Sequence, residues 1–418
     1  MDPRELRAMQ IAATTRLRKT TDHWIVPSQT GTGSYKVTPR RVETFRADQH
    51  GRFTCTCPDY ELRCQPCKHT MAVELTIRRE VSETGQETVT KELRVTYTQD
   101  WAAYNRGQCE EGERFTPMLA DLCSTIRQPH QGRGRPRLPM SDMAFEMVSK
   151  VYTGLSARRH DSDVREHCSK GLTAQDPHFN SVLRYMRDPE MTPVLTRLVE
   201  LSALPLKGVE TDFAVDSTGF TTSRFVRWYD HKWGKERSRQ EWVKLHAMTG
   251  VRTNIVTAVE VTDWRNNDTK YLPPLLTTTA DNFTIGDVSG DKAYISKSNL
   301  NAIEKFGGSP FIPFKADQGA YLIDAPAPAP EASAWDRLFH MFAYHREDFL
   351  LRYHQRSNVE ATFSVIKRKF GDSLRSKSEV GQYNEVLCKV IAHNLCCVIS
   401  AVYELDLEVP GFSNALAS

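Results

Sequence analysis

The sequence has no long apolar run and little net charge. Hydrophobic side chains make up 39% of its 418 residues, which is enough for a packed core. No stretch approaches the roughly 20 apolar residues that a membrane-spanning helix needs, and the chain opens with polar residues rather than a signal peptide. A formal net charge of +3 points to no class of partner. We therefore expect a cytoplasmic protein of two or three domains with no membrane contact.

The sequence also lacks the pattern of a disulfide-stabilised secreted domain. Ten cysteines are present, but four of them lie between residues 55 and 67, and the chain opens without an export signal. A reduced compartment and a metal site explain this crowding better than disulfides. One residue separates Cys55 from Cys57, and one separates Cys67 from His69. Three thiolates and an imidazole can surround a zinc ion tetrahedrally.

This spacing resembles the SWIM zinc finger, C-x-C-x(n)-C-x-H. The resemblance implies a structural Zn²⁺ held by Cys55, Cys57, Cys67 and His69, with Cys64 as the alternative to Cys67. Upstream, apolar and polar side chains alternate around glycines, which predicts short antiparallel strands. Residues 1–98 are therefore expected to form a small β-rich zinc-binding module. SWIM modules are linked to binding of DNA or protein, and both partners stay open.

Helical periodicity dominates the next segment. Apolar residues recur at helical intervals across residues 101–122, and again in three segments that begin near residues 141, 179 and 192. We interpret residues 141–209 as a helical region that either binds DNA or braces the domain that follows.

A basic loop lies between these helices. Arg133, Arg135 and Arg137 alternate with Gly and Pro, which predicts an extended backbone. The Arg-Gly-Arg-Pro sequence resembles the core of an AT-hook, which implies that the arginines bind in a narrow A·T minor groove. A solvated basic linker is the alternative. Residues 99–140 are assigned to a helical segment with this AT-hook-like linker.

Residues 210–402 are predicted to alternate strands and helices around two aspartates. Asp216 ends a short apolar run, and Asp291 ends a second one. Asp268 lies between them and is interpreted as a helix cap rather than a ligand. β-Branched residues and turn signals predict further elements, namely strands at residues 224–229, 243–249, 254–262 and 310–314 and a helix at residues 298–304.

A single helix is predicted over residues 353–367, with four polar side chains along one stripe. These side chains are Tyr353, Arg356, Glu360 and Lys367, and an apolar stripe lies beside them. The spacing Y-x2-R-x3-E-x6-K resembles the signature of insertion-sequence DDE transposases of bacteria and archaea.

The resemblance implies an α/β, multidomain protein with an RNase H-like mixed sheet flanked by helices over residues 210–402, followed by a tail at 403–418. Asp216, Asp291 and Glu360 would be the catalytic triad, binding Mg²⁺ or Mn²⁺. Tyr353, Arg356 and Lys367 would contact DNA phosphates near the cut.

The same resemblance implies the activity and the partners. The protein would cut DNA at transposon ends and transfer strands to target DNA, as a homodimer in a synaptic complex at a prokaryotic nucleoid. A transposase-derived DNA-binding protein without cleavage, or an RNase H-like nuclease, is the alternative.

Overall fold

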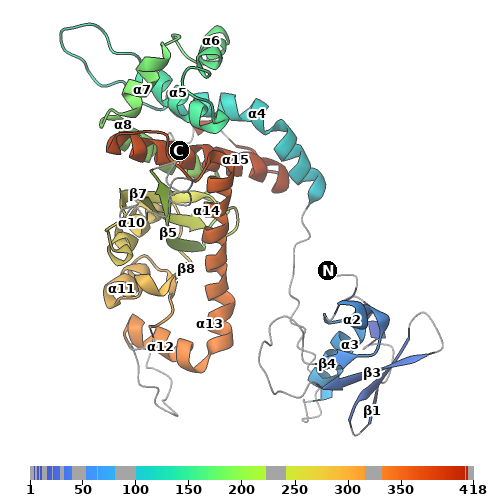
Figure 1. Ribbon diagram of the computed structural model, residues 1–418. Helices are drawn as coiled ribbons and strands as arrows, with labels where there is room; N and C mark the ends of the chain where they lie inside the picture. Colours follow the sequence, from blue (N-terminus) through green and yellow to red (C-terminus); the bar gives the residue numbers. More distant parts are fainter. Residues whose placement is uncertain are drawn as a thin grey trace, which may run out of the picture. The chain divides into compact units, whose positions relative to one another are not determined.

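The computed structural model divides into two compact units, residues 1–100 and 101–418 (Figure 1). In the smaller unit the structure describes residues 17–20, 22–28, 33–39, 53–63, 65–80 and 100, with Arg4, Arg7, Ala8, Gln10 and Ile11. In the larger unit it describes residues 101–222, 242–315, 332–409, 411 and 412.

The smaller unit pairs a four-stranded antiparallel sheet with two helices. Its strands are β1 (Arg18–Lys19), β2 (Trp24–Pro27), β3 (Ser34–Pro39) and β4 (Phe53–Cys55), in that order across the sheet. The helices are α2 (Pro58–Arg63) and α3 (Lys68–Glu80). Alternate side chains of β2 are buried, as the period of a half-buried strand requires, and Trp24 of β2 pairs with Val37 of β3 in the core. The small β-rich unit that the sequence predicts is therefore present.

The larger unit is built around a five-stranded mixed sheet in the order β7-β6-β5-β8-β9. An antiparallel meander comprises β5 (Phe213–Thr221), β6 (Trp242–Gly250) and β7 (Val256–Asp263). Parallel strands β8 (Asp287–Gly290) and β9 (Ser309–Phe311) follow on the other side of β5. This order confirms the predicted RNase H-like sheet. The predicted strand at residues 224–229 lies outside the described residues.

Helices cover both faces of this sheet, and the alternation of β5 assigns its side chains to two cores. Phe213 and Val215 pack into one core, whereas Ala214 and Phe220 pack into the other. Asp216 is in step with Ala214, so its side chain lies on the face of the second core.

Before the sheet, the helices are α4 (Trp101–Ser124), α5 (Met140–Thr153), α6 (Asp161–Ser169), α7 (Phe179–Met186) and α8 (Met191–Ala203), with the turn η1 (Leu204–Leu206). Among and after the strands come η2 (Asp268–Tyr271), α10 (Leu272–Ala280), η3 (Lys292–Tyr294), α11 (Lys297–Lys305), α12 (Ala334–Tyr344), α13 (Arg346–Tyr353), η4 (His354–Arg356), α14 (Ser357–Phe370) and α15 (Glu379–Glu404).

The long helix α15 packs against α4, α5 and α8 (Figure 1). By length and composition it is the one helix among the described residues that could cross a membrane, but 78% of its apolar window is buried inside the unit. Its apolar character is that of a core helix.

The helix predicted over residues 353–367 is present, but a short 3-10 turn interrupts its α-helical hydrogen bonding. Tyr353 ends α13, the turn η4 intervenes, and Glu360 and Lys367 lie on α14. The two helices serve different cores, because the buried residue of α13, Phe349, belongs to one and Val359 of α14 to the other. The two helices nevertheless follow one another along one line in Figure 1, and the backbone angles of the turn are right-handed helical.

Candidate active site and zinc centre

Two of the predicted catalytic carboxylates lie where the parallel strands β5 and β8 stop pairing: Asp291 follows the last residue of β8, and Asp216 lies within β5. Val215 of β5 pairs with Gly290 of β8, so Asp216 and Asp291 come next on adjacent strands. Such strands lie about 4.8 Å apart. A Cβ atom on Gly290 would lie 2.9 Å from Cγ1 of Val215, which is closer than side chains pack. Sequence reasoning assigned no role to Gly290, yet its missing side chain lets the strand bearing Asp291 lie against β5.

Asp216 is partly buried, and its carboxylate has two donors. The Ser217 backbone N–H donates to Oδ1 at 2.8 Å, and Nη2 of Arg356 donates to Oδ2 at 3.0 Å. Burial raises the pKa of Asp216, and the negative charge of Asp291 adds to this, while Ser217 and Arg356 oppose it. The site therefore favours a further positive charge beside Asp216.

Asp291 is held by the turn that it begins. Its side chain caps η3 by accepting a hydrogen bond from the Lys292 backbone N–H at 2.6 Å. The turn fixes the aspartate at the edge of the sheet, as the position after a β-strand commonly does.

Glu360 reaches the same place from α14 through Arg356. Nη2 of Arg356 lies 2.8 Å from Oε1 of Glu360, so a single guanidinium nitrogen contacts both Glu360 and Asp216. The Glu360 side chain is 57% exposed, whereas that of Arg356 is 20% exposed. One cation thus joins the helix carboxylate to the strand carboxylate.

The other two signature residues lie differently. Tyr353 is partly buried and its ring stacks on Phe349, with centroids 5.8 Å apart. Burial raises its pKa, and its electrostatic neighbours include Arg356 and Asp291. Lys367 instead places Nζ 5.6 Å over the ring of Phe220, and burial lowers its pKa. Tyr353 therefore adjoins the carboxylates, while Lys367 lies beside the far end of β5.

A polar network beneath this site was missed by sequence reasoning. Asp268 does not cap η2, whose cap residue is Asn267. Its Oδ1 lies 2.6 Å from Nζ of Lys244 and 3.2 Å from Nδ1 of His246. Lys244 and His246 share one face of β6, and two polar residues at alternate positions of an otherwise apolar strand were the available signal.

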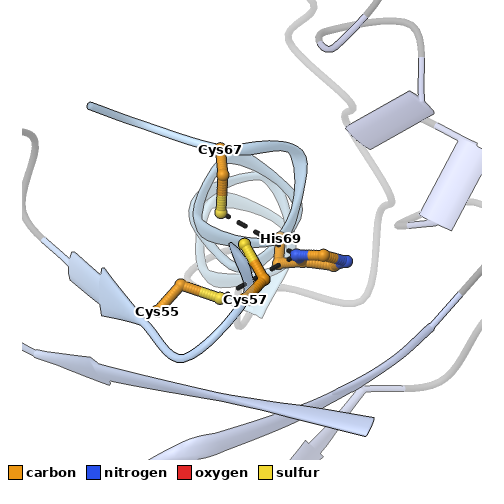
Figure 2. Close-up of side chains that lie close together, drawn as sticks. All are labelled: Cys55, Cys57, Cys67 and His69. Carbon is orange, nitrogen blue, oxygen red and sulfur yellow. Dashed lines mark hydrogen bonds between the residues drawn. The ribbon is translucent and has the colours of Figure 1, made fainter. Parts of the chain in front are cut away.

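The four predicted zinc ligands converge in the smaller unit. Their donor atoms all lie within 4.8 Å of one another, and all four side chains are buried (Figure 2). Nδ1 of His69 is 3.8 Å from Sγ of both Cys55 and Cys67. Cys55 ends β4, Cys57 lies in the next turn, and α3 begins between Cys67 and His69. Cys64 lies outside the described residues.

Because the thiols lie close together, their pKa values shift in different directions. The hydrogen bond with Cys55 lowers the pKa of Cys67, and the same contact together with burial raises the pKa of Cys55. A buried set of three sulfurs and one ring nitrogen fits the tetrahedral preference of zinc better than it fits a hard cation.

The predicted AT-hook arginines lie on an exposed loop that bends. The Gln131 side chain closes the bend, accepting from the Arg137 N–H and donating to the Arg135 carbonyl, each at 2.7 Å. Arg133 and Arg135 are exposed, while the guanidinium of Arg137 pairs with Glu190. The prediction of an extended backbone is therefore wrong for this part of the loop. The side-chain amide of Gln131 holds the bend by hydrogen bonding to the backbone of Arg135 and Arg137.

Comparisons with known proteins match two segments of the chain. The family model described as a transposase DDE domain matches residues 207–395, and that of the SWIM zinc finger matches residues 54–78. A solved structure of a piggyBac transposase synaptic complex with hairpin DNA is 10% identical, with a TM-score of 0.34 over 73% of this chain and 76% of that chain. No curated protein matches the chain.

Proposed function

Because the chain carries a transposase DDE domain and a SWIM zinc finger, we propose that it cuts and joins DNA strands with the carboxylates of Asp216, Asp291 and Glu360. The observation that carries this proposal is the convergence of the three side chains. Asp216 on β5 and Asp291 just after β8 follow the last paired residues of two adjacent parallel strands, and Arg356 links Asp216 to Glu360.

The donor set at this site fits Mg²⁺ or Mn²⁺. All three side chains offer carboxylate oxygens, which these hard cations prefer. Burial and the neighbouring Asp291 raise the pKa of Asp216, so a divalent cation would favour the ionised form of this carboxylate. Such ions, when bound, lower the pKa of an attacking water or 3′-hydroxyl and stabilise the leaving oxygen.

The side chains around the carboxylates are suited to holding DNA. Arg356 uses one nitrogen for both carboxylates, and a guanidinium carries five N–H donors in all. It can therefore pair with a DNA phosphate on its remaining side, and Tyr353 lies beside it as a second contact. Lys367, placed beside Phe220, would meet the backbone further from the cut.

The remaining parts of the chain supply binding and assembly in this proposal. Cys55, Cys57, Cys67 and His69 hold a structural Zn²⁺, and the arginines of the basic loop add phosphate or minor-groove contacts. Transposon ends and target DNA are the partners, and two copies of the chain pair the ends at the prokaryotic nucleoid. The zinc assignment rests on the donor geometry and the zinc-finger match, and the DNA partners rest on the match to a transposase DDE domain.

The test uses full-length protein and DNA carrying the sequences that flank its gene. Nicking and strand transfer are measured with Mg²⁺, with EDTA and with Glu360→Gln. We expect Glu360→Gln to lower cutting by about 100-fold or more, because one oxygen ligand of the cations is lost. Glu347→Gln is the matched control, since Glu347 is exposed on the neighbouring helix α13.

Three outcomes would contradict the proposal. Unchanged cutting by Glu360→Gln would remove Glu360 from the triad. End binding without cutting under any metal would make the protein a DNA-binding descendant of a transposase. Metal-dependent cutting without strand transfer would make it a nuclease.

A further inference from the structure

A second cluster of metal-ligating side chains lies in the helical part of the larger unit, outside the carboxylate site. It consists of Glu146 on α5, His160 at the start of α6 and His167 in the last turn of α6. Their donor atoms lie within 4.8 Å of one another. The side chains of Glu146, His160 and His167 are 0%, 1% and 12% exposed.

The distances within the cluster are those between neighbouring ligands of one ion. Oε2 of Glu146 lies 3.0 Å from Nε2 of His160, and Oε1 lies 3.1 Å from Nδ1 of His167. Ligands about 2.1 Å from a tetrahedral zinc ion stand roughly 3.4 Å apart. Hydrogen bonds have similar lengths, so a further observation must decide between an ion and a simple hydrogen-bonded group.

The second nitrogen of His160 excludes a simple group built on a neutral ring. Its Nδ1 lies 3.2 Å from Oδ2 of Asp163, so both ring nitrogens of a buried imidazole face carboxylate oxygens. A neutral imidazole has one N–H and can donate to just one of them. An imidazolium with two N–H groups would satisfy both carboxylates without an ion. A metal ion at Nε2 satisfies them as well, because the N–H at Nδ1 then donates to Asp163. A carboxylate oriented on the far nitrogen of a metal-bound histidine is the usual outer-shell arrangement.

We propose that Glu146, His160 and His167 bind a divalent ion of the zinc class, with Asp163 positioning His160. Two imidazoles and one carboxylate suit zinc better than Mg²⁺, which keeps to oxygen ligands and water. Three protein ligands leave a fourth position, which a water fills in zinc sites of this composition.

The ion's role in this proposal is to fasten α6 to α5. Helix α6 has nine residues and one buried side chain, Val164, so apolar packing holds it weakly. Helix α5, in contrast, is buried along most of its length and offers a fixed ligand in Glu146. The inference does not depend on transposase activity, because no residue of the carboxylate site takes part.

The experiment measures bound zinc in the full chain, in buffer with excess Mg²⁺ to occupy oxygen-rich sites. We expect two zinc equivalents in the wild-type protein and one in Cys57→Ser, which loses the finger. We expect His167→Asn to lose the other equivalent, and Asp163→Asn to weaken zinc binding by about 10- to 100-fold. Glu166→Gln is the matched control, because Glu166 lies on α6 but is exposed and pairs with Lys170.

Cobalt substitution provides a readout that does not need the ligand variants to fold. In Cys57→Ser, Co²⁺ at this site should show visible bands of a nitrogen- and oxygen-bound ion without the strong near-ultraviolet band of a thiolate ligand. If Cys57→Ser binds neither zinc nor cobalt, the cluster is a hydrogen-bonded group and the proposal fails. Equal zinc content in Cys57→Ser and in Cys57→Ser combined with His167→Asn would also overturn it, because the ion would then lie elsewhere.

Discussion

Among single residues, Asp268 shows how far its surroundings can shift the pKa of a carboxyl group near the candidate active site. Burial disfavours its charged form, but its interactions with His246, Lys244 and Ser217 outweigh burial and lower its pKa to about 2 from the ordinary value of 3.8. Its side chain is 20% exposed, so solvent screens the pair only in part. The carboxylate is therefore ionised in the folded protein throughout the neutral range.

Asp268→Asn should lower stability in a pH-dependent way. A folded-state pKa below the unfolded one stabilises the protein fully above about pH 4, and this contribution is lost as the pH falls towards 2. We expect a loss of about 2 kcal/mol in the free energy of unfolding at pH 7, shrinking below pH 4. Urea denaturation of the full chain at several pH values measures it.

Asp281→Asn is the matched control for that prediction. Asp281 is exposed just beyond the last residue of α10, where a negative charge is not favoured by the helix dipole. Its replacement should change stability by less than about 0.5 kcal/mol. A loss at Asp268→Asn that stayed constant from pH 7 to pH 3 would show that packing, rather than charge, explains it.

Candidate active-site residues that follow a recognisable local sequence pattern could be found from the sequence. Asp291 follows an apolar run and lies just after β8, as local pattern predicts, whereas β5 continues past Asp216 to Thr221. The contacts of Arg356 could not be found this way, because Asp216 is 140 residues away and the pairing depends on how α14 packs against β5. Short-range patterns give the position of a side chain, whereas tertiary packing selects its partner.

At the scale of elements, the starts of helices were predicted better than their continuity. Predicted starts near residues 141, 179 and 192 correspond to α5, α7 and α8, which begin at Met140, Phe179 and Met191. The break between α13 and α14 was not foreseen, because both segments have helical periodicity. The turn lies where the buried side chains pass from one core, which contains Phe349, to the other, which contains Val359.

The basic loop between α4 and α5 yields a prediction about DNA binding. Each phosphate contact contributes about 0.9 to the slope of log K against log salt concentration. Arg133 and Arg135 are exposed, so replacing both by Gln should reduce this slope for binding to transposon ends by about 2. Arg137→Gln should have a smaller effect, because its guanidinium pairs with Glu190 and must leave this partner to reach DNA.

Arg106→Gln is the control for that comparison. It removes the same charge from an exposed position on α4 and should leave the slope within about 0.3 of the wild-type value. The slope is read from fluorescence anisotropy titrations at several salt concentrations. Equal effects of Arg106→Gln and of the Arg133 and Arg135 replacements would mean that the loop is a solvated linker.

At the scale of the whole molecule, each unit has its own hydrophobic core. The core of the smaller unit includes Trp24, Val26 and Val37, together with three of the four predicted zinc ligands. The sequence revealed one motif in each unit, because the spacing of each motif is local. Because three ligands belong to this core, metal binding would contribute to its folding free energy.

Loss of a zinc ligand should therefore unfold one unit and spare the other. We expect Cys57→Ser to lose one zinc equivalent and to abolish the thermal transition of the smaller unit, because metal binding there supplies folding free energy. The transition of the larger unit should shift by less than about 1 °C, since its cores contain none of these ligands. Differential scanning calorimetry with limited proteolysis distinguishes the two units.

Cys109→Ser is the matched control. It replaces a cysteine at an exposed position on α4 and should retain both transitions and the zinc. Intact folding of the smaller unit in Cys57→Ser would mean that its small core suffices without the ion.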